Sequence, residues 1–311
     1  MPSQIDRCNC PLCAHPESRA VEQLSGEELR KLWRAVGRDF SAAAWGKIAP
    51  EYIIEPCQCE RCGFEFFEPS LAGNEAFYKE LEHAEYFVEN RPEFGRTLRL
   101  ARRLGLRRVL DVGCGSGIFL DLARQAGCET WGLELNGAAA EKARAKGHQV
   151  FSELLDGLKP GVKGFDLITL FQVLEHVPEP VPLLRQAAAR LGPGGLISVA
   201  VPSANGVLRL VPWDPHQWPP HHLTRWRLQD FEQSARAAQL TLIESGGDRL
   251  LGSEITHFWK VHNQLAPVLG KPGRLGGPAV LEALSIFYRK TGMKFLLPRW
   301  GSSIYAYFRR T

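Results

Sequence analysis

The chain has 311 residues, of which 44% are hydrophobic and 23% are charged, so it can bury a sizeable core and is not a disordered chain. Its net charge of +4 is too small to indicate a nucleic-acid or membrane partner. From Arg249 onward there are 10 basic and 2 acidic residues, net +8, which leaves −4 for residues 1–248. The first ten residues lack an apolar signal region, and no apolar run reaches the roughly 18 residues of a membrane span. We therefore expect a soluble, cytoplasmic protein.

Six of the eight cysteines fall in two short clusters near the start of the chain. Paired C-x-x-C knuckles without a secretory signal indicate thiolates around one structural Zn²⁺ more often than disulfides. A redox pair and a nucleic-acid-binding ribbon are the alternatives, and 45 residues separate the knuckles, more than in a compact ribbon. The predicted zinc ligands are Cys10, Cys13, Cys59 and Cys62, with Cys8 and Cys57 as alternates.

Residues 1–70 are expected to form this zinc-ribbon domain with a helical insert. Ser25 and Glu28 form a capping box, and apolar residues then recur at helical spacing from Leu29 to Val36. Residues 75–104 are expected to form one or two N-terminal helices of a second domain that spans 71–311. The arginines of that stretch are assigned to its solvent face; they are Arg96, Arg99, Arg102 and Arg103.

From Arg108 onward, short apolar runs alternate with helical segments, which predicts an α/β domain with a largely parallel sheet. The predicted strands are 108–112, 129–135, 148–151, 165–171, 195–201, 240–245 and 302–308. The predicted helices are 117–126, 137–146, 180–191 and 227–238, with left-handed ends at Gly127, Gly147 and Gly192. Residues 250–300 are aromatic and basic, and we expect a helical, lid-like insertion before the last strand.

The most informative motif is the glycine turn that follows the first of these strands. Its sequence D-V-G-C-G-S-G contains Asp111, Gly113, Cys114, Gly115 and Gly117. Glycines let a backbone turn sharply and approach a ligand closely. Glu134 follows Gly117 by 17 residues at the end of the next strand, where a carboxylate can accept both hydroxyls of a ribose.

These motifs resemble the class I S-adenosylmethionine (SAM)-dependent methyltransferases. F-D-L-I through F-Q-V-L-E-H-V-P-E-P (165–180) and L-G-P-G-G (191–195) are similar to the branch that includes ubiquinone-biosynthesis O-methyltransferases. The resemblance implies a Rossmann-like sheet of seven strands and SAM as cofactor. It places Asp111 and the glycine turn at the methionine end, Glu134 on the ribose and Leu135 on adenine. Gln172 is placed near the methyl group, and Tyr86 in a segment that in relatives covers the methionine end.

The cysteine-bearing part has a resemblance of its own. Methyltransferases with an N-terminal zinc ribbon, often encoded among polysaccharide genes, have a similar layout of knuckles. They are also similar in the strings F-E-F-F-E-P (64–69) and P-P-H-H-L-T-R-W (219–226). The second string lies in a loop rich in proline and tryptophan, well placed to close over an acceptor.

The candidate catalytic residues are Glu175, His176 and His222. The first two lie just beyond the carboxyl end of a central strand, where open α/β sheets bind ligands, and histidine can accept a proton near neutral pH. The alternatives are that the Glu-His pair holds the loop and that His222 caps the next helix. A metal held by His176, His216, His221 and His222 requires converging geometry that a sequence does not show, and methyl transfer needs no metal.

The sequence therefore predicts a SAM-dependent methyltransferase that acts on a small molecule or glycan precursor, at an oxygen atom. The basic C-terminal region favours an anionic acceptor such as a phosphorylated sugar. One alternative is an RNA or protein methyltransferase that uses the ribbon and this basic region for binding. The other is a SAM-binding regulator without activity, because binding motifs do not prove turnover.

Overall fold

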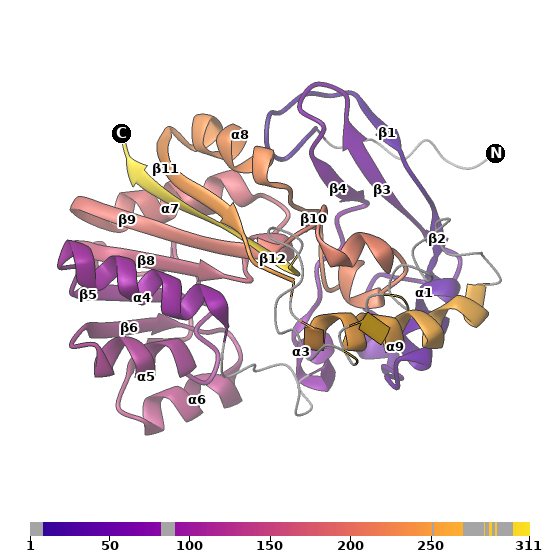
Figure 1. Cartoon of the computed structure of the whole chain (residues 1–311), viewed down its shortest axis with the longest axis horizontal. Helices are drawn as coiled ribbons and strands as arrows, with labels where there is room; N and C mark the ends of the chain where they lie inside the picture. The colour runs from indigo at the N-terminus through magenta and orange to yellow at the C-terminus, as the bar shows by residue number, and fades with distance from the viewer. Residues whose placement is uncertain are drawn as a thin grey trace.

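The computed structural model describes residues 9–81, 91–250, 252–269 and 301–311, and the four single positions 283, 286, 287 and 290. Two β-sheets lie side by side, the larger on the left of Figure 1 and the smaller at the upper right. Helices pack on both. Across the described segments, no helix is long and apolar enough to cross a membrane.

The larger sheet has seven strands in the order β11-β12-β9-β8-β5-β6-β7. All pairings among β5 to β9 are parallel, and β12 runs antiparallel to both of its neighbours. A strand lies at each of the seven predicted positions: β5 Arg108–Val112, β6 Glu129–Leu133, β7 Gln149–Phe151, β8 Phe165–Phe171, β9 Leu191–Pro202, β11 Leu240–Gly247 and β12 Ser303–Arg310. The predicted seven-stranded α/β fold is thus confirmed.

The strand order reverses between β5 and β8, and this switch point fixes where a ligand can bind. From β5 the chain moves outward through β6 to β7, whereas β8 and β9 lie on the other side of β5. In open α/β sheets, ligands bind at the carboxyl ends of the strands at such a point. The turns after β5 and β8 therefore form the candidate site.

Helices cover both faces of this sheet. Helices α4 and α5 pack with Leu167 and Leu196 on one face, whereas α7 and α8 pack with Ile168 and Ile197 on the other. Helix α6 packs against α5 through Ala140. Their bounds are α4 Pro92–Leu104, α5 Ile118–Gln125, α6 Gly137–Ala145, α7 Pro180–Arg190 and α8 Leu228–Ala238. The 3₁₀ helices η1 (Leu174–His176), η2 (Val207–Leu210) and η3 (Pro215–Gln217) belong to the loops at the carboxyl edge.

The smaller sheet carries the cysteine knuckles. It is formed by β1 Ser18–Ala20, β2 Leu24–Ser25, β3 Ile53–Cys59, β4 Glu65–Glu68 and β10 Thr224–Arg225. Strand β10 comes from the chain after β9 and pairs antiparallel with β4. The accompanying helices are α1 Gly26–Ala35, α2 Ala42–Trp45 and α3 Glu75–Leu81. The predicted capping box starts α1: the Ser25 hydroxyl accepts from the backbone N–H of Glu28, whose carboxylate accepts from the backbone N–H of Ser25.

Two hydrophobic cores join the N-terminal region to the rest of the chain. One core continues from Phe64 beside the knuckles through Trp226 to Phe231 of α8. The other packs Trp33 of α1 against Trp218 and against helix α9, Gly252–Leu269. Helix α9 lies within the predicted insertion and beside α1 in Figure 1. These cores hold the loops after β9 against the knuckle-bearing sheet.

Two expectations for local structure were wrong. Gly192 lies inside β9 and does not end α7 with a left-handed residue, although Gly127 and Gly147 do adopt positive φ after α5 and α6. Arg96 is not a solvent-facing residue of α4. Its guanidinium lies 3.8 Å from the centre of the Tyr305 ring and donates to the Asp248 carboxylate, because α4 packs beside β12 at this point.

Candidate functional site

The glycine turn connects β5 to α5. Gly113, Gly115 and Gly117 all have positive φ, from +53° to +80°. The backbone N–H groups of Gly113 and Cys114 donate to the carbonyl oxygen of Leu133, 2.8 and 3.0 Å away. A Cβ atom at Gly113 would lie 3.0 Å from a Val173 methyl group, so the turn is both strained for other residues and closely packed.

Glu134 lies directly beside this turn. Its carboxylate accepts from the backbone N–H of Gly115 at 2.7 Å and from that of Asn136 at 2.8 Å. A carboxylate has about four acceptor sites, so this fixed group can still accept from two hydroxyls. The next residue, Leu135, is a large apolar side chain that is 63% exposed. A fixed acceptor beside an exposed apolar surface suits a nucleoside.

Asp111 and Cys114 are buried within the turn. The Asp111 carboxylate accepts from the Thr169 hydroxyl at 2.6 Å, and burial raises the pKa of Asp111 to about 7. The Cys114 side chain packs among apolar residues of α5 and α6 and against Gly132, where a Cβ atom would lie 2.5 Å from its sulfur. Both side chains are therefore buried beneath the turn and support it from inside the protein.

Gln172 occupies the carboxyl end of β8, across the switch point from the turn. It has a positive φ of 56°, which is uncommon for a residue other than glycine and concentrates at functional sites. Its side-chain amide lies 3.3 Å from the buried Glu93 carboxylate, at the start of α4. Arg91 lies 3.9 Å from the same carboxylate. The strained backbone thus aims the Gln172 side chain at the start of α4.

Glu175 and His176 follow in η1. Glu175 is 1% exposed, and its two carboxylate oxygens have no hydrogen-bond partner among the described residues. Burial raises the pKa of Glu175 to about 8 and lowers the pKa of His176 to about 4. Nδ1 of His176 lies 2.6 Å from the carbonyl oxygen of His221, and its Nε2 lies 3.8 Å from the Glu175 carboxylate. Near pH 7, Glu175 is therefore mostly protonated and His176 neutral.

The loop after β9 brings two further histidines to this pair. The ring of His222 lies 4.9 Å from that of His176 and stacks at 4.5 Å on that of His221. One ligand atom from each of these three histidines lies within 4.8 Å of the other two. We call these residues, His176, His221 and His222, the histidine cluster. His222 does not cap α8, which begins at Leu228 after Arg227.

The pair of Glu175 and His176 also holds this loop. Besides the His176 contact with the His221 carbonyl, the backbone N–H of Leu223 donates to the carbonyl oxygen of Glu175 at 2.7 Å. The geometry is therefore compatible with the alternative that Glu175 and His176 hold the loop in place. A residue that holds the loop can also take part in the reaction.

The site also contains residues that the sequence did not single out. Tyr78 of α3 lies 6.1 Å from the His176 ring, and burial together with the nearby Glu175 carboxyl raises the pKa of its phenol. Arg91 and Glu93 precede the glycine turn by about twenty residues and have no motif that marks them. Tyr86, which was expected at the methionine end, lies outside the described residues.

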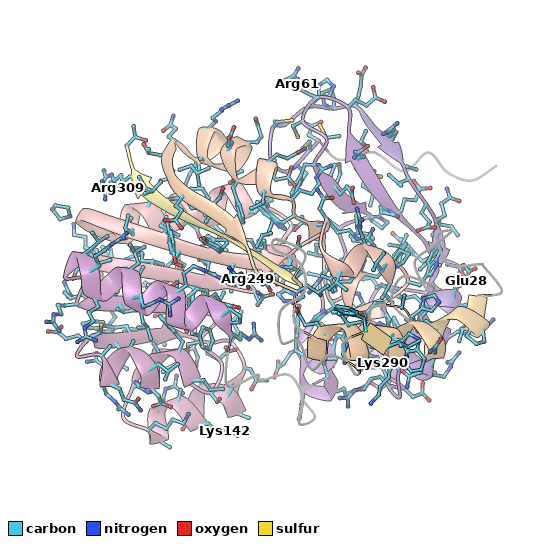
Figure 2. All side chains as sticks on the ribbon, in the orientation of Figure 1. Glu28, Arg61, Lys142, Arg249, Lys290 and Arg309 are labelled. Carbon is cyan, nitrogen blue, oxygen red and sulfur yellow. The ribbon has the colours of Figure 1, made fainter. Side chains whose placement is uncertain are left out.

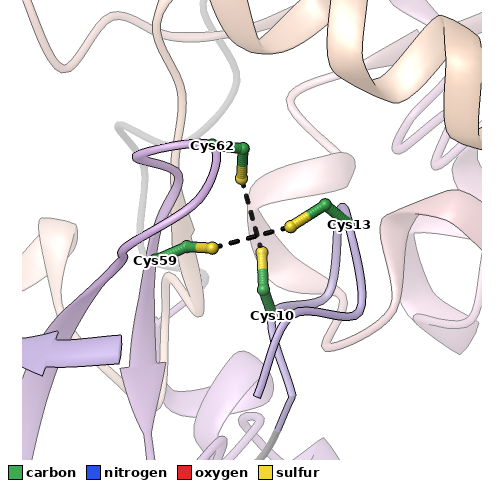
Figure 3. A group of neighbouring side chains, drawn as sticks. All are labelled: Cys10, Cys13, Cys59 and Cys62. Carbon is green, nitrogen blue, oxygen red and sulfur yellow. Dashed lines mark hydrogen bonds between the residues drawn. The ribbon is translucent and has the colours of Figure 1, made fainter. Parts of the chain in front are cut away.

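The four predicted zinc ligands converge from the two knuckles (Figure 3). The sulfur atoms of Cys10 and Cys62 lie 3.7 Å apart, and those of Cys13 and Cys59 lie 3.5 Å apart. Four sulfurs in a tetrahedron at the usual Zn–S distance of about 2.3 Å would be about 3.8 Å apart. The donor set therefore fits a closed tetrahedral site for Zn²⁺.

The alternates do not join this group. Cys57 is buried in β3 and is not one of the four converging residues. Cys57 and Cys59 are two residues apart in this strand, so their side chains point to the same face but stand at different positions along it. Cys8 lies outside the described residues. None of the described cysteines forms a disulfide.

Comparison with known proteins identifies the family. A family model described as a methyltransferase domain matches residues 80–245, more than half of the chain. The chain belongs to this methyltransferase family. The ubiquinone biosynthesis O-methyltransferase of Bordetella avium is 31% identical over 191 residues, which is 52% of this chain and 73% of that protein. The protein of the same name from Methylococcus capsulatus is 30% identical over 145 residues, 39% of this chain and 60% of that protein.

Solved methyltransferase structures are also similar to this chain. A SAM-dependent methyltransferase from Archaeoglobus fulgidus is 18% identical, covers 70% of this chain and 94% of its own, and has a TM-score of 0.46. Magnesium protoporphyrin IX methyltransferase from Synechocystis, solved with bound SAM, is 12% identical, covers 70% of this chain and 78% of its own, and has a TM-score of 0.42. The predicted activity is confirmed: the enzyme is a SAM-dependent methyltransferase.

Proposed function

We propose that this methyltransferase transfers the methyl group of SAM to a hydroxyl oxygen of a small-molecule or glycan-precursor acceptor, bound beside the histidine cluster. The observation that carries the proposal is the meeting of Gln172, Glu175 and His176 at the carboxyl end of β8, next to the glycine turn. The names of the relatives, ubiquinone biosynthesis O-methyltransferases, support transfer to oxygen on a small molecule.

In this proposal the cofactor binds along the ends of β5 and β6. The bound cofactor supplies an electrophilic methyl group on a sulfonium. Glu134 accepts from the ribose hydroxyls while the backbone of Gly115 holds its carboxylate in place. Leu135 covers the adenine, and Gln172 faces the methyl group. The glycine turn, Cys114 and Asp111 shape the methionine end, where Tyr86 is also expected.

His176 is the proposed base for the acceptor hydroxyl. Its Nδ1 carries the proton donated to the His221 carbonyl, so Nε2 has a free electron pair in the neutral ring. A base whose pKa is about 4 is weak towards a resting hydroxyl. As the oxygen bonds to the methyl carbon, however, its proton becomes strongly acidic and a weak base suffices. The protonated Glu175 carboxyl lies 3.8 Å from Nε2 of His176, the atom that would receive the proton. The His222 ring packs against the His176 ring.

The test of this function is a screen for transfer of a labelled methyl group. The acceptors are catechol-type quinol precursors, nucleotide sugars, RNA and an unrelated protein. We expect labelling of a hydroxyl on a small molecule. Labelling of RNA or protein alone would contradict the proposal, and so would the absence of transfer to any acceptor by protein that binds SAM.

We also propose that the four cysteines bind one structural Zn²⁺ and that this ribbon forms a domain of about 70 residues. Structural zinc contributes on the order of 10 kcal/mol to the folding of small zinc domains. Cys59→Ser should therefore remove one zinc per chain and abolish the folding of the β1–β4 region. Cys128→Ser, a change to a half-buried cysteine outside the knuckles, is the matched control. Folded protein without zinc, measured by elemental analysis and circular dichroism, would contradict this.

We further propose that the acceptor carries a negative charge. The basic C-terminal residues labelled in Figure 2, Arg249, Lys290 and Arg309, lie at three separate places, with Arg249 nearest the centre where the two sheets meet. The attraction would therefore come from few charges, and we expect a modest salt effect. Raising the salt concentration should weaken acceptor affinity and leave SAM affinity unchanged. Equal weakening of both would contradict an anionic acceptor.

A further inference from the structure

The histidine cluster has the hydrogen-bonding pattern of a set of metal ligands. Nδ1 of His176 lies 2.6 Å from the His221 carbonyl oxygen, and Nδ1 of His221 lies 2.8 Å from the His216 carbonyl oxygen. Nδ1 of His222 lies 3.3 Å from the side-chain oxygen of Gln217. A carbonyl oxygen only accepts, so each Nδ1 carries the proton. Metal-ligating histidines are held in this way, with the second ring nitrogen donating to a carbonyl or carboxylate.

This pattern determines which nitrogen of each ring carries an electron pair. In a neutral ring with the proton on Nδ1, the electron pair is on Nε2. One ligand atom of each of the three rings lies within 4.8 Å of the other two, and a divalent cation requires nitrogen ligands that converge in this way.

A carboxyl group and two guanidinium groups surround the cluster. The Glu175 carboxyl lies 3.8 Å from Nε2 of His176 and is buried with no hydrogen-bond partner among the described residues, so a cation bound beside it would displace its proton and gain a negatively charged neighbour. Arg91 acts electrostatically on His176 and Arg225 on His222. These guanidinium groups disfavour a cation that is bound by charge alone, such as Mg²⁺. They are less unfavourable to a metal whose bonds to imidazole nitrogen are strong.

We propose that His176, His221 and His222 bind a divalent transition-metal ion through Nε2, with Glu175 beside it, at a site separate from the four cysteines. Imidazole ligands suit Zn²⁺, Fe²⁺, Ni²⁺ and Cu²⁺ rather than Mg²⁺ or Ca²⁺. The ion lies at the carboxyl end of β8, on the side of Gln172 where the acceptor is proposed to bind.

Metal binding at this site does not depend on the acceptor proposed above. A hydroxyl bound to such an ion would lose its proton more easily, so the ion would take over the role assigned to His176 as a base. Loss of turnover on changing His176 is expected whether His176 acts as a base or as a metal ligand, so turnover does not distinguish these two roles. Metal content does distinguish them, because it is measured without methyl transfer.

The experiment measures metal in the full chain, purified without a polyhistidine tag from cells supplied with zinc. Elemental analysis should give two metal ions per chain in the wild type, and X-ray absorption at the zinc edge should show both sulfur and nitrogen ligands. His222→Gln should retain one ion with sulfur ligands only. His216→Gln is the matched control, because His216 lies next to the cluster, is paired with Asp214 and offers no converging atom. It should retain two.

Three results would overturn the proposal. The first is one ion per chain in the wild type with sulfur ligands, and the second is two ions whose spectrum shows sulfur ligands alone. The third is two ions in a folded His222→Gln protein, since the second ion would then lie elsewhere. If His222→Gln does not fold, as judged by circular dichroism and by binding of S-adenosylhomocysteine, the wild-type stoichiometry and spectrum decide the question. Metal at this site in an enzyme that methylates no hydroxyl would contradict the proposed acceptor and leave this site standing.

Discussion

The two ends of the carboxyl edge of the sheet are built differently. At the ends of β5 and β6, one short stretch of chain from Asp111 to Asn136 supplies backbone donors, a partly exposed carboxylate and an exposed leucine. At the end of β8, the polar groups come from four segments, around residues 78, 91, 175 and 221. They are buried or half-buried, and burial moves the pKa values of Glu175 and His176 so that both groups are neutral near pH 7.

This difference teaches how the two ligands can be held. A polar, charged cofactor is matched by fixed hydrogen bonds, which cost little reorganisation when it binds. On the proposed acceptor side most polar groups are withdrawn from solvent, and in methyl transfer the alignment of oxygen and methyl carbon contributes much of the rate. Mutations at the first end should therefore change cofactor affinity, and mutations at the second end should change turnover.

The largest effect is expected from the histidine cluster. His176→Ala should lower kcat by roughly 10²- to 10⁴-fold, the usual contribution of a positioned base. His222→Ala should lower it less, and neither change should alter the Kd for SAM. The control His216→Ala removes a neighbouring ring outside the cluster and should retain turnover. Normal kcat in both cluster variants would exclude these residues from the mechanism.

Glu134→Ala should give the opposite result. Hydrogen bonds to a charged group contribute about 1.5–3 kcal/mol, so SAM affinity should fall by roughly 100-fold in isothermal titration. Glu141→Ala is the matched control, because Glu141 is an exposed residue of α6 whose carboxylate pairs with Arg144. Unchanged SAM affinity in Glu134→Ala would contradict the assignment of the ribose position.

Asp111 gives a pH-dependent effect on stability. Burial raises its pKa from the ordinary 3.8 to about 7, so the folded state binds more protons than the unfolded state between these values. Stability is then lost as pH rises through this range, by about 2–3 kcal/mol between pH 5 and pH 8. Asp111→Asn keeps an oxygen that can accept from Thr169 and should remove this loss. Urea unfolding at the two pH values measures it, and an equal loss in both proteins would show that Asp111 is not responsible.

The smallest effect is expected at Leu135. Because this side chain is largely exposed, Leu135→Ala should leave the melting temperature unchanged. Loss of its apolar contact with adenine should weaken SAM binding by about 1 kcal/mol, roughly fivefold. A lower melting temperature with unchanged affinity would show that the residue packs within the protein and does not contact the cofactor.

The sequence predicted the seven strands and the knuckles because their signals are local. A glycine turn, a capping box and C-x-x-C spacing each depend on residues within a few positions of one another. His221 and His176 are 45 residues apart in the chain. Their approach depends on packing between the N-terminal region and the loop after β9, which no local pattern encodes. For the same reason the role of Arg96, which packs on Tyr305 beside a distant strand, was wrongly predicted.

The pairing of β10 with β4 likewise has no sequence signal, because β10 has only two residues. Single side chains at the acceptor side, such as Tyr78 and Glu93, are also not marked by any motif. Their positions follow from how α3 and α4 pack, which periodicity alone does not determine. Sequence reasoning therefore identified the glycine turn and Glu134, which the structure brings together, but it did not identify Tyr78 or Glu93.

The most direct test is one titration series with S-adenosylhomocysteine on the wild type, Glu134→Ala and His222→Ala. The account predicts that Glu134→Ala binds roughly 100-fold more weakly, whereas His222→Ala binds like the wild type while its turnover is reduced. If His222→Ala lost as much affinity as Glu134→Ala, or if Glu134→Ala bound like the wild type, the division between a cofactor end and an acceptor end would be contradicted.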